Sequence, residues 1–308
     1  MQIWVADGER GLMLGQNGKY RRVGAPGKAL CAAAGRIYCA GEKRCVCYDR
    51  ATAAPLFDFS VPPGVCDLAA MGDCVYALSA DADSVTSFRA DTGEACFCAP
   101  AGNYPRALRV SPRGNCLAVA GGAAGEILLL DGCLRLAARH RVPGTAVDVC
   151  FLPRGMAALC AVGDGELSAH LMRISPRGVL EEAFAAPLVP SALCALGAGR
   201  CLVGCHGEVA AVRGDGRVAF RLPCPYPARL CAGSGEALIV DPWQGTVLRL
   251  TGERVYQGGE PMNVLAFPVS PGQGGAMGSA AVSGVPSPGL HPRGAPGSPG
   301  DRREWAPG

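Results

Sequence analysis

A proline recurs about every 40 residues along the chain, each time just before a short apolar run. The seven prolines are Pro26, Pro63, Pro105, Pro143, Pro190, Pro227 and Pro261. Successive prolines are 37, 42, 38, 47, 37 and 34 residues apart. Proline fits the first residue of a strand because that residue need not donate a hydrogen bond to its neighbour. A period of about 40 residues is the length of one four-stranded propeller blade, so the spacing predicts seven blades.

The clearest copy of the repeat covers residues 104–131 and shows what one unit contains. Ala107–Val110 alternates and then meets Ser-Pro-Arg-Gly, a turn in which Pro presets φ and Gly suits the exit. Two more apolar runs follow, Leu117–Ala120 and Ile127–Leu130, with the glycine-rich Gly121–Gly125 between them. Each run is short and bounded by turn residues, which indicates strands. The predicted fold class is therefore all-β.

The two ends of the repeat array complement each other. The chain begins with three strand-like runs, Gln2–Ala6, Gly11–Leu14 and Lys19–Val23, that correspond to the second, third and fourth strands of a blade. The last repeat supplies only an inner strand, Met262–Phe267. Pairing these fragments removes the free edges that an open sheet would expose. The sequence therefore predicts a seven-bladed β-propeller of four-stranded blades over residues 1–267, with its ring closed by strands from both termini.

Residues 268–308 differ in character from the repeats. They are rich in Gly, Pro, Ser and Ala and have no periodicity. Such a segment cannot bury enough apolar surface to offset the entropy lost on ordering. We expect a disordered tail that the propeller does not need.

Composition excludes several functions. The net charge is only +3 and no Lys/Arg cluster alternates with aromatic residues, so we expect no nucleic-acid partner. No apolar run reaches the roughly 18 residues of a membrane span, and the N-terminus lacks the pattern of a signal peptide. We therefore expect a cytoplasmic monomer without membrane contact, whose 17 cysteines stay reduced.

The repeat resembles the unit of the YVTN or YncE-like family of bacterial β-propellers. The resemblance rests on Gly102–Pro105, Val110–Gly114, Leu117–Ala120 and the closing Leu130-Asp131, and weaker copies cover residues 1–267. It implies a propeller and a bacterial origin. It leaves the function open, because similar propellers include scaffolds, binding proteins and enzymes.

A second resemblance is to the lactonase-type seven-bladed propellers, similar to 6-phosphogluconolactonase. Tyr104-Pro105-Arg106 followed by Ser111–Gly114 looks like the repeat of that family. The family also carries a catalytic His in another such loop, near a carboxylate and an arginine. This chain has four His residues, and none follows one of the seven blade prolines.

The turns that share one face of the predicted ring offer a candidate binding site. In propeller geometry this upper face gathers the turns that enter each inner strand and those that join the second strand to the third. Acidic and aromatic residues and two arginines fall there, and they could bind a polar ligand or a cation. The candidate ligand-binding residues are Glu42, Tyr104, Arg106, Glu126, Glu166, Glu208, Arg229 and Trp243. The alternative is that Asp-Gly and Gly-Glu pairs are ordinary hairpin turns that face water.

The cysteines are explained most simply as small side chains that pack in the core. Five predicted inner strands carry one, at Cys31, Cys66, Cys150, Cys194 and Cys231. Inner strands crowd the ring axis, where small side chains fit, although a thiol-lined channel could also hold a soft metal. The chain has no nucleophile-elbow motif and no phosphate loop. We therefore expect no catalytic residue, no metal site and no cofactor.

Two hypotheses from different classes remain. In the first, the chain is a non-enzymatic propeller that presents its upper face to a protein partner or a small polar ligand. In the second, it is a lactonase-like hydrolase acting on a sugar lactone or similar small polar substrate, with Arg106 and carboxylates such as Glu126 at the site.

Overall fold

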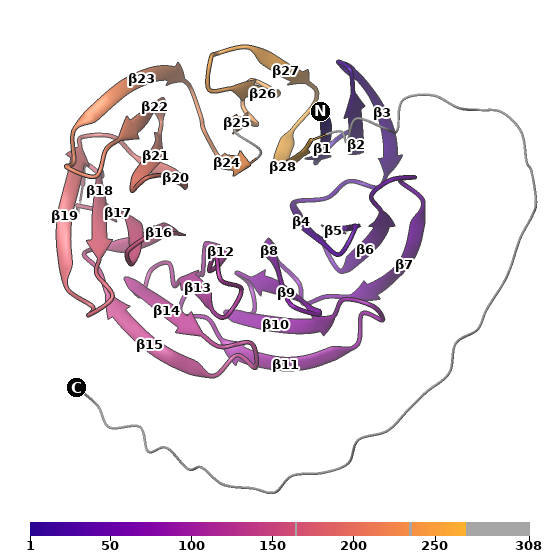
Figure 1. The fold of residues 1–308 in the computed structure, drawn as a ribbon, viewed down its shortest axis with the longest axis horizontal. Coiled ribbons are helices and arrows are strands. Elements are labelled where there is room, and N and C mark those ends of the chain that lie inside the picture. Colours follow the sequence, from indigo (N-terminus) through magenta and orange to yellow (C-terminus); the bar gives the residue numbers. More distant parts are fainter. Residues whose placement is uncertain (164, 234–235, 269–308) are drawn as a thin grey trace, which may run out of the picture. The chain divides into compact units, whose positions relative to one another are not determined.

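The computed structural model describes residues 1–163, 165–233 and 236–268, and all of the secondary structure within them is β-sheet. Seven antiparallel four-stranded sheets surround one axis as the blades of a propeller (Figure 1). The predicted seven-bladed ring is thereby confirmed. The predicted tail, residues 268–308, lies outside the described residues except for Pro268, so its expected disorder stays a prediction. Among the described residues, no helix is long and apolar enough to cross a membrane.

Each blade runs from an inner strand beside the axis to an outer strand on the rim. Blade 1 consists of β28 Pro261–Phe267, β1 Gln2–Asp7, β2 Gly11–Gln16 and β3 Lys19–Gly24. Blade 2 consists of β4 Ala29–Ala33, β5 Arg36–Ala40, β6 Arg44–Asp49 and β7 Pro55–Ser60. Blade 3 consists of β8 Val65–Met71, β9 Cys74–Ser79, β10 Ser84–Arg89 and β11 Ala95–Pro100. Blade 4 consists of β12 Ala107–Val110, β13 Leu117–Ala120, β14 Glu126–Leu130 and β15 Leu136–Arg141.

The last three blades follow the same order. Blade 5 consists of β16 Thr145–Phe151, β17 Met156–Val162, β18 Ser168–Ile174 and β19 Leu180–Ala186. Blade 6 consists of β20 Pro190–Gly197, β21 Arg200–Cys205, β22 Gly207–Val212 and β23 Val218–Cys224. Blade 7 consists of β24 Arg229–Gly233, β25 Glu236–Asp241, β26 Thr246–Arg249 and β27 Arg254–Gln257.

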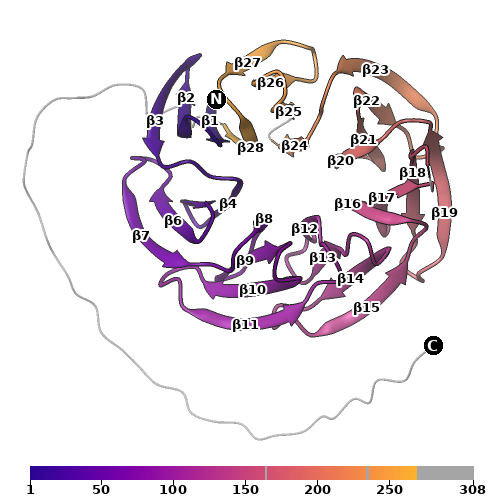
Figure 2. The same cartoon turned by 180° about the vertical axis from the view of Figure 1, so that it is seen from behind.

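Blade 1 closes the ring with strands from both ends of the chain, as the sequence predicts. β28 and β1 are antiparallel neighbours, with Val264 opposite Val5, and both views show them side by side (Figures 1 and 2). The buried carboxylate of Asp7 fastens this junction. It accepts hydrogen bonds from the Tyr256 hydroxyl at 2.8 Å and from the backbone N–H groups of Gly259 and Glu260. Asp7 of blade 1 is thus linked to Tyr256 of blade 7 and to the segment that leads into β28.

The core lies between neighbouring blades. Trp4 of blade 1 is fully buried and its ring centroid lies 6.4 Å from that of Tyr48 in blade 2. Phe59 and Phe88 join blades 2 and 3 in the same way, at 4.9 Å. Outer strands such as β11 are mostly exposed. Nine of the 17 cysteines are buried, which is consistent with their use as small core side chains.

Strand direction defines two faces of the ring. We call the upper face the end at which the chain enters each inner strand and at which the second strand turns into the third. The lower face is the end at which the inner strand turns into the second and the third into the fourth. The blade prolines stand at the upper face, at or just before the inner strands, as the sequence predicts.

Candidate functional site

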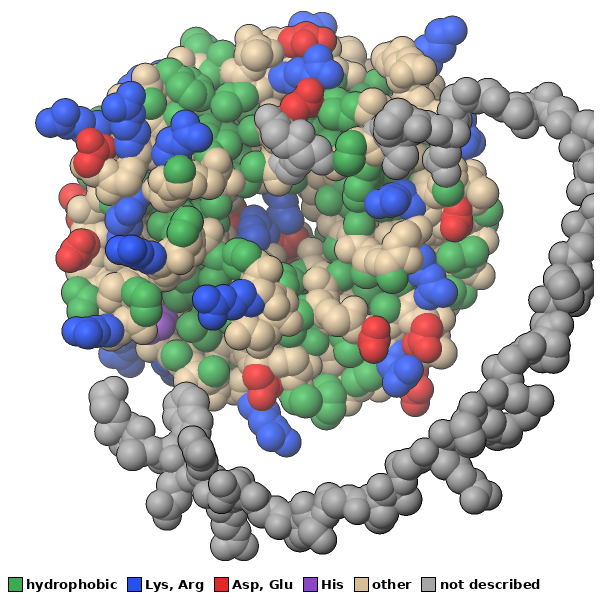
Figure 3. Space-filling model, in the orientation of Figure 1, with side chains coloured by type: hydrophobic (Ala, Val, Ile, Leu, Met, Phe, Trp, Pro, Cys, Tyr) green, Lys and Arg blue, Asp and Glu red, His purple; other side chains and the backbone are tan. Residues whose placement is uncertain are grey.

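A pocket of about 570 Å³ opens on the upper face at the ring axis, and all seven blades contribute to its lining. Its charged and polar lining residues are Lys28, Asp81, Arg106, Asp148, Ser191, His206, Tyr226 and Arg229. Seen down the axis, basic and acidic side chains occupy the central opening (Figure 3). Residues at or just before the start of each inner strand line the pocket, so every blade contributes to it.

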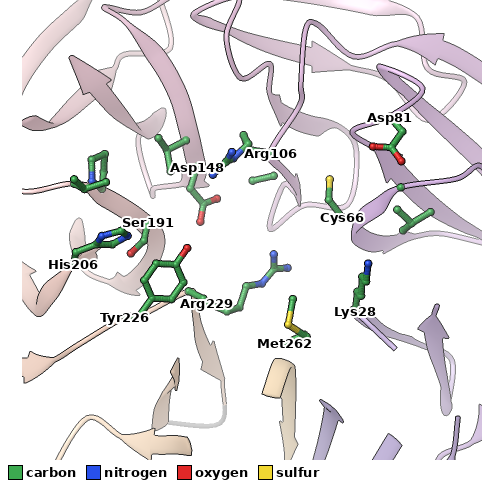
Figure 4. A pocket seen from close by; sticks show the side chains of 17 residues that line it. Lys28, Cys66, Asp81, Arg106, Asp148, Ser191, His206, Tyr226, Arg229 and Met262 are labelled. Atoms are coloured by element: carbon green, nitrogen blue, oxygen red, sulfur yellow. The ribbon is translucent and has the colours of Figure 1, made fainter. Parts of the chain in front are cut away.

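The floor of the pocket holds a network of two arginines and two aspartates. The guanidinium of Arg109 on β12 bridges the two carboxylates, with Nη1 at 2.5 Å from Asp67 Oδ2 and Nη2 at 2.8 Å from Asp148 Oδ1. Arg229 on β24 donates to the other oxygen of Asp67 at 2.5 Å. Figure 4 shows the Arg229 guanidinium pointing into the middle of the pocket. We call these four residues the axial network.

The two aspartates also bind the backbone of the following blade. Asp67 on β8 accepts hydrogen bonds from its neighbour Leu68 and from Leu108 of blade 4, both at 2.9 Å. Asp148 on β16 accepts from Leu193 of blade 6 at 2.8 Å, and likewise from its own neighbour. A register shift precedes each aspartate in its inner strand. Such a bulge redirects a side chain, and here it aims the carboxylate at the next blade.

The axial network favours the charged forms of Asp67, Arg109 and Arg229, as the direction of each pKa shift indicates. Burial raises the pKa of the Asp67 carboxyl, but Arg229, Arg109 and the Leu108 N–H outweigh that effect, so the pKa lies below its ordinary value. Burial lowers the pKa of Arg109, and the carboxylates of Asp148 and Asp67 more than reverse this. Two positive and two negative charges therefore compensate one another, and the network adds no net charge to the floor.

The rim of the pocket carries charges that the floor does not neutralise. Lys28 and Arg106 are exposed, and neither forms an ion pair with another residue in the described part of the chain. Asp81 is the exposed carboxylate of the rim. In Figure 4, Arg106 and Asp148 lie on one side of the pocket, and Lys28, Cys66 and Asp81 lie on the other. An anionic group of a ligand would meet two cations that form no ion pair with the described residues.

Three aromatic side chains form a row at one side of this rim. The ring centroids of His206 and Tyr226 are 4.6 Å apart, and those of Tyr226 and Trp243 are 6.3 Å apart. Trp243 is 79% exposed. An aromatic ring exposed beside others offers an amphipathic contact surface of the kind enriched at binding sites.

The structure brings together only part of the predicted ligand-binding set. Arg106 and Arg229 line the pocket, and Trp243 joins the aromatic row at its rim. Tyr104 is 64% exposed on the same face. Glu42 and Glu166 are exposed and are not among the residues that line the pocket. Ligand binding by any of these residues stays a prediction.

Two of the predicted glutamates engage outer strands instead of the axis. Glu126 at the start of β14 lies 3.3 Å from Arg139 of β15. Glu208 on β22 forms an ion pair with Arg221 of β23. Neither lines the pocket. Both glutamates thus pair with an arginine on the fourth strand of their own blade.

Of the axial network, only Arg229 is predicted from the sequence, because charged site residues are sought there in the turns of the upper face and not within the inner strands. Its members lie 39 to 162 residues apart in sequence. A signal exists nonetheless. Asp67, Arg109 and Asp148 each interrupt an apolar inner-strand run. A charge is seldom buried without a partner, so three such interruptions could have indicated mutual pairing at the axis.

No metal cluster is found among the residues that the structure describes, and the described lining of the pocket offers no activated nucleophile. On blade 5, outside that lining, Ser168 Oγ lies 2.9 Å from His170 Nε2, and His170 Nδ1 lies 2.5 Å from Glu182 Oε2, so a hydroxyl, an imidazole and a carboxylate stand in series. Ser191 Oγ donates a hydrogen bond to the carbonyl of Pro227 at 2.8 Å. Burial raises the pKa of the Cys66 thiol to about 12, so this thiol is not poised to ionise near neutral pH. No group of three or more His, Cys, Asp or Glu within the described ranges could hold a metal ion.

Comparison with known proteins supports the fold. No family model matches the chain, and no curated protein matches its sequence. A solved structure of a candidate 6-phosphogluconolactonase from Bacteroides uniformis is similar, with a TM-score of 0.69 at 13% identity over 86% of this chain and 98% of that one. The WD40 repeats of RRP9 give a TM-score of 0.63 at 15% identity, covering 77% and 83%. BamB from Moraxella catarrhalis gives 0.54 at 11% identity, covering 77% and 88%.

These likenesses, all below 25% identity, show the β-propeller architecture alone. The resemblance of the repeat to the YncE-like family stays a prediction.

Proposed function

We propose that this chain is a non-enzymatic binding scaffold. Its upper-face pocket receives an anionic group, carried by a small polar ligand or by a side chain of a protein partner. The observation that carries the proposal is the contrast within the pocket: the buried charges compensate one another, whereas Lys28 and Arg106 on the rim have no partner among the described residues. The narrower assignments, to YncE-like propellers, to the cytoplasm and to a monomer, stay predictions.

The rigidity of the floor supports this function. Asp67 and Asp148 link blades 3, 4, 5 and 6 through side-chain and backbone hydrogen bonds. A floor that is already satisfied does not have to rearrange when a ligand arrives, and preorganised donors bind with a smaller entropic cost. The exposed cations then supply attraction, and the Tyr226 hydroxyl and the His206 ring supply directional contacts.

The candidate site also favours binding over hydrolysis. A lactonase needs a base or nucleophile near the reacting carbonyl. Asp148 already accepts two backbone N–H groups and an arginine. Glu126, the carboxylate that the hydrolase hypothesis pairs with Arg106, is bound to Arg139 and does not line the pocket.

Two assays on the full chain separate the hypotheses. The first is thermal unfolding with sodium citrate, a compact polyanion, at constant ionic strength. We expect citrate to raise the Tm of the wild type and to have less effect on Arg106→Ala. The second is hydrolysis of a panel of sugar lactones, where we expect the rate of the buffer alone.

The control is Arg21→Ala, which removes an exposed arginine from β3, away from the pocket. It should respond to citrate like the wild type. Lactone hydrolysis that disappears in Arg106→Ala would overturn the non-enzymatic assignment. A Tm that citrate leaves unchanged would overturn the anion site.

A further inference from the structure

A second concave surface lies on the lower face, between blades 4 and 5. It is a groove of about 310 Å³, at the small end of ligand pockets, and its floor is largely apolar. Half-buried Leu129 and Phe151 contribute to it, together with Met156 and three prolines. This lower groove shares no residue with the upper pocket.

Three turns of one sequence type border the lower groove. Each contains Pro-Arg-Gly, at residues 112–114, 153–155 and 176–178. The glycine has a positive φ in every case, +64°, +90° and +79°, a backbone conformation that favours Gly. Ser111 and Ser175 brace two of the turns by accepting backbone hydrogen bonds on their hydroxyls. The three turns therefore share a glycine conformation, and two of them are also held by a serine side chain.

The three turns bring one arginine into the groove lining and two more next to it in sequence. Arg113 lines the groove, and Arg154 and Arg177 directly follow lining residues Pro153 and Pro176. All three are exposed, and none forms an ion pair with another residue in the described ranges. His140 adds a further basic side chain to the lining, and the described lining residues include no carboxylate. The surface combines an apolar slot with a rim of one sign of charge.

We propose that the lower groove binds an extended acidic segment of a partner protein that inserts one bulky apolar side chain between the three arginines. The apolar floor matches such a side chain, and carboxylates on either side of it match the rim. Arginine favours carboxylates because its planar donors can bind both oxygens. The groove holds about one large side chain, so a short peptide suits it better than a folded surface. This inference does not depend on the function proposed for the upper pocket.

Fluorescence anisotropy on the full chain tests the proposal. The probe is a labelled ten-residue peptide of Asp and Glu with one central Phe. We expect saturable binding that weakens with added salt. Replacing the peptide's Phe by Ala should weaken binding about tenfold, because it removes the buried apolar contact. A peptide with Asn and Gln in place of the acids should weaken it at least as much.

Variants of the protein locate the contact. The triple variant Arg113→Gln, Arg154→Gln, Arg177→Gln should lose about tenfold or more in affinity. The matched triple Arg21→Gln, Arg213→Gln, Arg217→Gln removes the same charge from exposed sites outside the groove and should change affinity less than about twofold. Circular dichroism should show both variants folded, because all six side chains are exposed.

Four outcomes overturn the proposal. The first is that the acidic Phe peptide shows no saturable binding, and the second is that both triple variants lose affinity equally. The third is that Arg106→Ala, at the upper pocket, loses peptide binding. The fourth is that poly-uridylate binds more strongly than the peptide and displaces it. The last would assign the groove to nucleic acid. Self-association of the chain that the groove triple abolishes, without peptide binding, would assign it to a second copy.

Discussion

The axial network beneath the upper pocket and the arginines near the lower groove differ in whether their charges are paired. At the upper pocket, two arginines and two aspartates at the ring axis are buried or nearly so, and each is paired. At the lower groove, Arg113, Arg154 and Arg177 stand on exposed turns around an apolar floor. Burial explains the difference. A charge taken out of water needs a partner within the protein, whereas a charge left in water does not.

The comparison separates residues that hold the ring together from residues available for recognition. The axial network spans blades 3 to 7 and should matter for stability. The rim of the upper pocket and the arginines of the lower groove should matter for binding and little for stability. Substitutions at the two places therefore have different expected effects.

Asp67→Ala should have the largest effect. It removes the carboxylate that pairs with both Arg109 and Arg229, and it also removes the acceptor for the Leu108 N–H. Leaving two partly buried guanidinium groups without that partner should lower the free energy of unfolding by about 3–5 kcal/mol. Urea unfolding followed by circular dichroism measures it.

Asp91→Ala is the control for that substitution. Asp91 pairs with Arg89 on the surface, where both side chains are more than half exposed. Its urea midpoint should stay close to that of the wild type. Similar losses in the two variants would contradict the distinction between the axial network and exposed ion pairs.

Acid should weaken the interactions of two buried aspartates, Asp67 of the axial network and Asp7 at the ring closure. Although burial raises the pKa of Asp67, Arg229 and Arg109 hold it below its ordinary value of 3.8. The same holds for Asp7, where burial is outweighed by hydrogen bonds from Arg10, Tyr256, Glu260 and Glu9. A depressed carboxyl pKa contributes stability that is complete above the ordinary pKa and is lost as the pH falls through the folded-state value.

The urea midpoint should therefore be flat near neutral pH and fall below about pH 4. Asp67→Asn, already destabilised at pH 7, should show a shallower fall. An equally steep fall of the urea midpoint in this variant would mean that Asp67 contributes nothing to the loss of stability at low pH.

Arg106→Ala and Arg113→Ala should separate the two surfaces by affinity. Each removes one exposed cation, so neither should alter the urea midpoint measurably. Arg106→Ala should weaken citrate binding about fivefold, while Arg113→Ala leaves it unchanged. Isothermal titration calorimetry measures the citrate affinity of both variants. A larger loss in Arg113→Ala than in Arg106→Ala would move the anion site to the lower groove.

Trp243→Ala should have the smallest effect on stability, because its side chain is 79% exposed. We expect the same Tm as the wild type in differential scanning calorimetry. A clear fall in Tm would show that Trp243 supports the fold of blade 7 and would remove it from the aromatic recognition row.

The repeat made the seven-bladed ring predictable from the sequence. The pairing of charges in the axial network could not be predicted in the same way. Pro26 to Pro261 mark the inner strands one by one, and the runs Gln2–Ala6 and Met262–Phe267 complete one blade because strand pairing is local to a blade. The axial network depends on contacts between blades, so no single repeat contains it. Arg229 was predicted as a residue of the upper face, yet its partner Asp67 lies 162 residues away.

The glutamates show why turn position alone is a poor guide to a site. Glu126 and Glu208 occupy equivalent places at the upper face, and both pair with an arginine on the outer strand of their own blade. The direction of a side chain at a turn depends on cross-strand partners, which the residue's place in the repeat does not specify.

Hydrogen exchange with and without sodium citrate tests the central claim most directly, because one experiment observes both surfaces of the full chain. If the upper pocket is the anion site, citrate should slow exchange in the segments 64–68, 104–109 and 226–230, which enter the inner strands. Exchange in the lower-face turns 111–115, 152–156 and 175–179 should not change. Protection confined to the lower turns, or no protection anywhere, would contradict the assignment of the upper pocket.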